Sequence, residues 1–205
     1  MPASIKLVSD FVDYYDSAFR PDGDIEYRRL MSECMSKGRA LDWLKLHNIP
    51  TLETKSVREF SRFDNKIVVY TDTKLHMGKG KIICSYQEAI DNYPNYLGAP
   101  YIEGTDGLSL KFLQIGSRRF RIMFKNPNYE FELKNGDITS IEELRPEYNY
   151  SISIPIFSID YIPRNNSMIA VDFNEVQPLY YLGIDKFLSP GDIRNEVEKF
   201  IKRSN

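Results

Sequence analysis

Two aspartates and an asparagine lie inside apolar segments near the end of the chain. Asp160 falls within Phe157–Ile162, and Asp172 and Asn174 close the segment Ile169–Asn174. Side chains alternate along a strand, so Asp172 and Asn174 point the same way, and a hairpin would bring Asp160 to that face. These oxygen donors suit Mg²⁺, which bridges substrate phosphates. The alternative is a solvent-facing polar row, which the apolar neighbours disfavour because burying an unneutralised carboxylate is costly.

A second candidate site is the glycine- and lysine-bearing segment His76–Lys81, between two apolar runs. Glycines let the backbone approach an anion closely, and lysines supply positive charge for it. The segment lacks the GxxxxGK[ST] pattern of a Walker A loop. The alternative is a solvated hairpin turn. The residues that would cover a phosphate are Gly78, Lys79, Gly80 and Lys81.

Three basic residues in the middle of the chain are candidates for catalysis. Alternation places Arg119 and Arg121 on one face of their strand, and Lys111 belongs to the strand before it. Such a basic face could neutralise a phosphate. The alternative is that these side chains pair with Glu130 and Glu132 across strands.

Apolar periodicity and turn residues predict which elements position these side chains. A third early helix should carry Leu41, Leu44 and Leu46 after an interruption at Gly38, and end near His47, because Pro50 follows. Ser85 should cap a helix that stops before Pro94, and Ser189 should cap the last one. The other helices are expected at 10–19, after Asp24 and at 56–63, and the strands at 66–71, 81–84, 108–115, 118–124, 129–133, 152–162 and 168–174.

This order predicts an α+β protein with a mostly antiparallel sheet in its second half. We expect a helical N-terminal segment over residues 1–50 and a small lobe with the nucleotide loop over 51–104. A sheet lobe with the metal site and the C-terminal helix should cover 105–205.

Composition excludes several classes of protein. The chain has 205 residues and a formal net charge of −2, which argues against a nucleic-acid coat or a polybasic membrane protein. No apolar run reaches the roughly 18 residues of a membrane span, and the first ten residues lack the apolar core of a secretory signal. Cys34 and Cys84 are too few for a disulfide framework, so reduced thiols in the cytoplasm are expected.

Taken in order, short segments of the chain resemble the successive motifs of ATP-grasp enzymes. The closest likeness is to glutathione synthetase-like and ribosomal-protein glutamate ligase-like members, across roughly residues 41 to 202. Val68–Asp72 and Ala170–Asn174 also resemble strings in short bacterial and phage proteins. The segments that carry the ATP-grasp likeness are Leu44–Thr51, Lys66–Tyr70, Met77–Lys81, Ser85–Ile90, Ala99–Gly104, Leu110–Ile122, Ile159–Tyr161 and Val171–Asn174.

The resemblance implies a role for each matching residue. It implies that Mg²⁺ is held by Asp160, Asp172 and Asn174, and that Lys79, Lys81 and the Gly78 and Gly80 backbone cover the phosphates of ATP. Tyr70 stands near the family's strand lysine, which Lys66 or Lys74 would replace, and Lys111 stands near a phosphate- or substrate-binding arginine. The residues around adenine and ribose would be Tyr101, Ile102 and Glu103.

The activity implied by this resemblance is an Mg²⁺-dependent carboxylate–amine ligase. ATP phosphorylates a carboxylate, and an amine then attacks the acyl phosphate. One alternative is a non-catalytic accessory or inhibitory protein that binds a nucleotide or a protein on the same scaffold. Another is an interaction protein that uses its 14 tyrosines at an interface. A homodimer is expected, since a shortened N-terminal region would leave a sheet edge or apolar face to cover.

Overall fold

The computed structural model describes residues 36–61, 65–73, 80–128, 136–145, 152, 154–174 and 179–204. The helices expected before residue 36 and the strand expected at 129–133 lie outside these ranges. So do Lys74, Gly78, Lys79, Glu130 and Glu132. In the described part of the chain, no helix is both long enough and apolar enough to cross a membrane.

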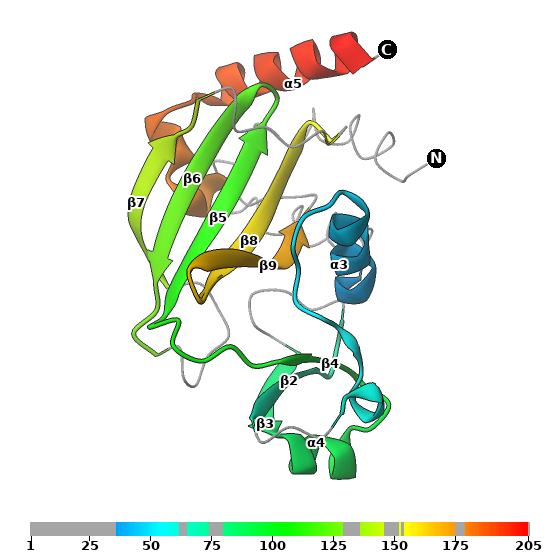
Figure 1. Cartoon of the computed structure of the whole chain (residues 1–205). Helices are drawn as coiled ribbons and strands as arrows, with labels where there is room; N and C mark the ends of the chain where they lie inside the picture. The colour runs from blue at the N-terminus through cyan, green and yellow to red at the C-terminus, as the bar shows by residue number, and fades with distance from the viewer. Residues whose placement is uncertain are drawn as a thin grey trace.

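Two antiparallel sheets form the framework (Figure 1). The smaller sheet has the order β1-β4-β2-β3, and the larger has the order β7-β6-β5-β8-β9. The smaller sheet contains β1 (Lys55–Ser56), β2 (Lys66–Tyr70), β3 (Lys81–Ser85) and β4 (Leu97–Pro100). The larger contains β5 (Leu108–Ile115), β6 (Arg118–Lys125), β7 (Asp137–Glu143), β8 (Ile156–Arg164) and β9 (Ser167–Asn174). The predicted α+β class is confirmed.

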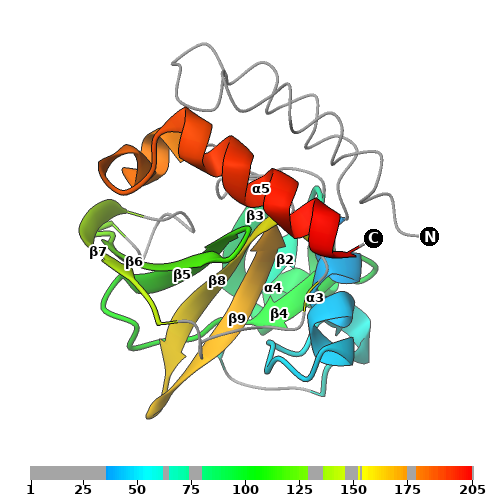
Figure 2. The same ribbon diagram turned by 90° about the horizontal axis from the view of Figure 1, so that it is seen from above.

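Helices cover both faces of the five-stranded sheet. The helix α3 (Lys37–Leu46) packs Ala40, Leu41 and Leu44 against β8 and β9. On the other face, α5 (Pro190–Ser204) lies across the end of the sheet where β5 turns into β6 (Figure 2). The remaining helices are α4 (Tyr86–Asn92) and the 3-10 turns η2 (Val57–Glu59), η3 (Leu179–Leu182) and η4 (Ile184–Lys186).

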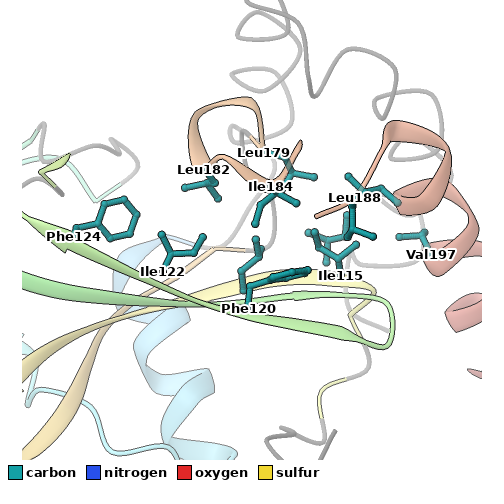
Figure 3. Packing of buried hydrophobic residues seen from close by; sticks show 12 residues of the cluster. Ile115, Phe120, Ile122, Phe124, Leu179, Leu182, Ile184, Leu188 and Val197 are labelled. Carbon is teal, nitrogen blue, oxygen red and sulfur yellow. The ribbon is translucent and has the colours of Figure 1, made fainter. Parts of the chain in front are cut away.

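The apolar cluster beneath α5 forms the core on one face of the larger sheet. Figure 3 shows Phe120 and Ile122 on the sheet facing Leu182 and Ile184, with Val197 of α5 at one side. The predicted glycine turn between β5 and β6 is present, and Gly116 has a φ of +56°. A Cβ at this position would lie 2.5 Å from the Glu196 carbonyl oxygen, so glycine is required for both conformation and space.

A second apolar cluster joins the two sheets. Val68 and Tyr70 of β2 and Ala99 of β4 pack with Ile169 of β9, and Leu52 belongs to the same cluster. The Leu52 N–H donates to the Ala170 carbonyl at 3.3 Å, which fastens this segment to β9. This packing places the end of β2 beside the β8–β9 hairpin.

Several sequence predictions need correction. Leu46 is 80% exposed, because two residues after Leu44 is more than half a turn round the helix. Gly38 lies inside α3 rather than interrupting it. The helix expected at 56–63 is a single 3-10 turn, and β8 begins at Ile156, since Pro155 cannot donate a ladder hydrogen bond.

Candidate functional site

Two buried ion pairs lie on neighbouring elements of the larger sheet. The Nζ of Lys111 on β5 is 2.5 Å from Oδ1 of Asp160 on β8, and the Nζ of Lys37 on α3 is 2.7 Å from Oδ1 of Asp172 on β9. Asp160 is the register partner of both Lys111 and Asp172. Partners in an antiparallel ladder share one face of a sheet. The structure therefore brings Lys111 and the two predicted carboxylates together.

Strand alternation explains the rest of this polar row. Ser158 and Asn174 are register partners, one alternation step from Asp160 and Asp172. Both are buried. The Nζ of Lys111 donates to the Ser158 hydroxyl oxygen at 3.1 Å, so this lysine is held by two strand residues.

Lys37 comes from far earlier in the chain and was not among the residues singled out from the sequence. It stands in the first turn of α3, where its backbone N–H donates to the Thr73 carbonyl at 3.0 Å. Burial lowers the pKa of its ammonium to about 8; Asp172 acts to raise that pKa, and the positive charge of Lys81 lowers it further. No motif marks Lys37, because its role depends on where α3 packs.

Tyr70 links this row to the smaller sheet. It is the last residue of β2, and Lys81 at the start of β3 is its register partner. The Nζ atoms of Lys37 and Lys81 each lie 5.9 Å from the centroid of the Tyr70 ring. Burial, with Asp172 nearby, raises the pKa of the Tyr70 phenol, so it stays neutral and donates a proton to hydrogen bonds.

We call these residues together the lysine–aspartate cluster. Its three ammonium groups exceed its two carboxylates by one positive charge, and within the described residues Lys81 has no ion-pair partner. A partly buried positive surplus attracts an anion, because the low local dielectric strengthens the interaction. The cluster consists of Lys37, Tyr70, Lys81, Lys111, Ser158, Asp160, Asp172 and Asn174.

The residues predicted around adenine gather at the other end of β2. Lys66 is exposed, and its Nζ lies 5.9 Å from the centroid of the Tyr101 ring. The Tyr101 N–H donates to the Lys66 carbonyl at 3.0 Å. Ile102 packs against the cluster between the sheets, and Glu103 is exposed. At about 3.3 Å per strand residue, Lys66 and Tyr70 are separated by roughly 13 Å.

Arg119 and Arg121 do not join the cluster. The register partner of Lys111 on β6 is Ile122, so the arginines at odd positions point to the opposite face of the sheet. Arg121 pairs with Glu142 on β7, and Arg119 donates to the Ser117 carbonyl. The sequence named Glu130 and Glu132 as the cross-strand partners, and both lie outside the described residues.

Of the glycine–lysine segment, Gly80 and Lys81 are described. Gly80 has a φ of +67°, in the region that favours glycine, and its carbonyl accepts a hydrogen bond from the Asp72 N–H at 3.2 Å. Lys81 lies in the cluster, whereas Gly78 and Lys79 lie outside the described residues.

The oxygen donors of the cluster fit Mg²⁺ by their chemistry. Two carboxylates face each other on adjoining strands, and the amide of Asn174 is one alternation step away on the same face. Among the described residues, no three His, Cys, Asp or Glu side chains group to hold a metal. A cation here would therefore need the amide oxygen or ligand oxygens in addition to Asp160 and Asp172.

Comparison with solved structures finds matches of low sequence identity. The D-alanine–D-alanine ligase from Bacillus anthracis complexed with ATP has a TM-score of 0.49 and 13% identity, covering 83% of this chain and 67% of that one. The macrocyclase MdnC from Microcystis aeruginosa, bound with precursor peptide MdnA, has a TM-score of 0.47 and 12% identity, covering 88% and 69%. A RimK domain ATP-grasp protein from Sphaerobacter thermophilus has a TM-score of 0.41 and 13% identity, covering 82% and 66%.

No protein-family model and no curated protein sequence matches the chain. The residues of the lysine–aspartate cluster are therefore the basis for inferring function.

Proposed function

We propose that the lysine–aspartate cluster binds the phosphates of ATP in an ATP-grasp-type carboxylate–amine ligase. The observation that carries this proposal is the convergence of Lys37, Lys81 and Lys111 around only two carboxylates. These lysines come from three separate elements, α3, β3 and β5. A phosphate group would neutralise the surplus charge and bind the ammonium groups by charge-assisted hydrogen bonds.

The reaction class follows from the resemblance of the motifs. Transfer of the γ-phosphoryl group to a carboxylate gives an acyl phosphate and ADP, and attack by an amine then releases phosphate. This chemistry depends on positioning and charge neutralisation, and it needs no protein nucleophile. Lys111 would neutralise charge on the transferred group, and Lys37 and Lys81 would hold the remaining phosphate oxygens. An enzyme that consumes ATP works where ATP is supplied, so we place the protein in the cytoplasm.

Mg²⁺ is the cofactor that we assign to this site. Asp160, Asp172 and Asn174 would hold it, and when bound it neutralises and orients the phosphate oxygens. Tyr101, Ile102 and Glu103 would lie near the adenosine, with Lys66 beside them. We do not include Arg119 and Arg121, because their ion pair and hydrogen bond lie on the opposite face of the sheet.

Thermal melting tests this proposal. ATP with Mg²⁺ should raise the melting temperature of the wild type, because a ligand that binds only the folded state stabilises it. Asp172→Ala should lose the Mg²⁺-dependent part of that shift. A wild type that melts at the same temperature with and without ATP would contradict the proposal.

Release of ADP separates a ligase from a protein that only binds nucleotide. The wild type should release ADP when a pool of carboxylates and amines is added. The matched control is Arg121→Ala, whose side chain lies away from the cluster and should leave this release unchanged. ATP binding without ADP release from any acceptor pool would favour a non-catalytic binding protein.

A further inference from the structure

The two buried lysines of the cluster differ in how they are held. Lys111 contacts both the Asp160 carboxylate and the Ser158 hydroxyl, on the strand next to its own. The contacts of the Lys37 ammonium are the Asp172 carboxylate, at 2.7 Å, and the face of the Tyr70 ring. Lys111 is therefore held by an ion pair and a hydrogen bond, whereas the ammonium of Lys37 has one polar contact, its ion pair with Asp172.

From this difference we infer that Lys37 exchanges partners during ligand binding. It holds Asp172 in the ligand-free protein, and it moves to a phosphate oxygen of the nucleotide when a divalent cation binds Asp172. This inference rests on the proposed function, and it adds to it a residue that couples the cation to the phosphate.

The position of Lys37 on its helix supports this exchange. The partial positive charge at a helix N-terminus disfavours a cation in the first turn, where Lys37 lies. The Asp172 carboxylate compensates for that repulsion in the ligand-free protein. A phosphate would compensate for it equally well, because helix N-termini attract anions. Lys37 therefore needs a negative partner at all times, and either Asp172 or a phosphate can serve.

The position of the Tyr70 ring indicates where the Lys37 ammonium would meet a phosphate. The ammonium groups of Lys37 and Lys81 lie at the same distance, 5.9 Å, from the centroid of this ring. An anion bound beside the ring is within reach of both lysines, and it would relieve the repulsion between their charges. Lys37 would thus have a new partner close to its present place.

Lys37 and the cation would compete for the Asp172 carboxylate, and this competition couples cation binding to phosphate binding. Oδ1 of Asp172 is the atom that contacts Lys37, and it belongs to the carboxylate that we assign to Mg²⁺. An ammonium and a divalent cation bound to the same carboxylate repel each other, so Lys37 and the cation compete for Asp172. Cation binding therefore releases Lys37, and a phosphate that accepts Lys37 strengthens cation binding. By linkage, the cation strengthens phosphate binding by the same factor.

Binding of Mn²⁺ as a spectroscopic substitute for Mg²⁺ tests the inference. Free Mn²⁺ is measured by electron paramagnetic resonance, with and without ATP, for the wild type, Lys37→Gln and Lys81→Gln. Without ATP, Lys37→Gln should bind Mn²⁺ about tenfold more tightly than the wild type, because the competitor is gone. Lys81→Gln removes the same charge nearby but has no contact with Asp172, and should change Mn²⁺ affinity by less than about threefold.

ATP should increase the Mn²⁺ affinity of Lys37→Gln by less than it does for the wild type. Equal gains in Mn²⁺ affinity for Lys37→Gln and Lys81→Gln would overturn the inference, and so would no gain. If Lys37→Gln does not fold, Asp172→Asn provides the test: with EDTA present it should bind ATP more tightly than Asp160→Asn does. Equal ATP affinity of these two variants would overturn the inference. A wild type that binds no ATP would instead overturn the proposed function.

Discussion

The five-stranded sheet carries ion pairs at its β7 edge and between its inner strands β5 and β8, and the two sets differ in burial. On the β6–β7 side, the side chains of Arg121 and Glu142 are 46% and 53% exposed. On the β5–β8 side, those of Lys111 and Asp160 are 6% and 16% exposed. Exposed pairs contribute about 0–1 kcal/mol, and removing one partner of a buried pair costs about 3–5 kcal/mol.

This difference indicates what the buried charges are for. Apolar residues of similar volume often stabilise a protein as well as a buried ion pair does, so stability alone does not require charges at Lys111 and Asp160. Buried charges do provide a preorganised environment for a charged ligand. The exposed pairs near β7 need no such explanation, since they keep an edge strand charged and discourage pairing with another chain.

Loss of the Lys111 ammonium should have the largest effect on stability. Lys111→Met should lower the free energy of unfolding by about 3–5 kcal/mol, because Asp160 would remain buried without its partner. Urea denaturation followed by circular dichroism measures this. The double variant Lys111→Met/Asp160→Leu should recover most of the loss, since it removes the stranded carboxylate. A loss below about 1 kcal/mol in the single variant would show that this ion pair behaves like an exposed one.

Glu196 of α5 is about as buried as Asp160, but hydrogen bonds rather than a buried lysine hold its carboxylate. Its carboxylate accepts hydrogen bonds from the backbone and hydroxyl of Ser117, at the turn between β5 and β6. Burial acts to raise the pKa of Glu196, but the Ser117 hydrogen bonds and Lys199 together lower it below 4.5. Glu196→Gln should lower the free energy of unfolding by about 1 kcal/mol at pH 7, because it removes the charge that strengthens these bonds.

The decrease in the free energy of unfolding caused by Glu196→Gln should depend on pH, in a direction that follows from the lowered pKa. Because the pKa of Glu196 is lower in the folded protein, its contribution is complete above the ordinary value of 4.5 and disappears as the pH falls through the lowered one. Urea denaturation at pH 7 and at pH 3 should therefore show a smaller gap between wild type and Glu196→Gln at the lower pH. An equal gap at both would show that the charge of Glu196 plays no part.

The exposed pair near β7 should have the smallest effect. Arg121→Ala should change the free energy of unfolding by less than about 1 kcal/mol, and 1 M NaCl should reduce that change further, because salt screens exposed charges. The same salt should leave the effect of Lys111→Met nearly unchanged. Equal salt dependence of the two variants would mean that burial does not distinguish these pairs.

Strand alternation allowed the central part of the site to be predicted. The β8–β9 hairpin brings Asp160 opposite Asp172, as the apolar segments around them indicated. Alternation also placed Arg119 and Arg121 on one face, but it could not tell which face. That depends on the register between β5 and β6, which pairs Lys111 with Ile122.

Two features could not be predicted from local patterns. β7 has almost no apolar side chains facing a core, so it carries none of the alternation that marks a half-buried strand. Lys37 joins the site because the apolar face of α3 packs on β9. This packing brings the first turn of α3 beside Asp172. Contacts between segments so far apart follow from tertiary packing.

Isothermal titration of ATP with Mg²⁺ into the wild type, Lys81→Met and Arg121→Met tests most directly the proposal that the lysine–aspartate cluster binds phosphate. Lys81 has no ion-pair partner among the described residues, so its loss strands no carboxylate and should leave the free energy of unfolding near the wild-type value. We predict that Lys81→Met weakens ATP binding by about tenfold or more, as loss of a charge-assisted contact does, whereas Arg121→Met binds ATP like the wild type. Equal ATP affinity of Lys81→Met and the wild type would contradict a phosphate site at the lysine–aspartate cluster.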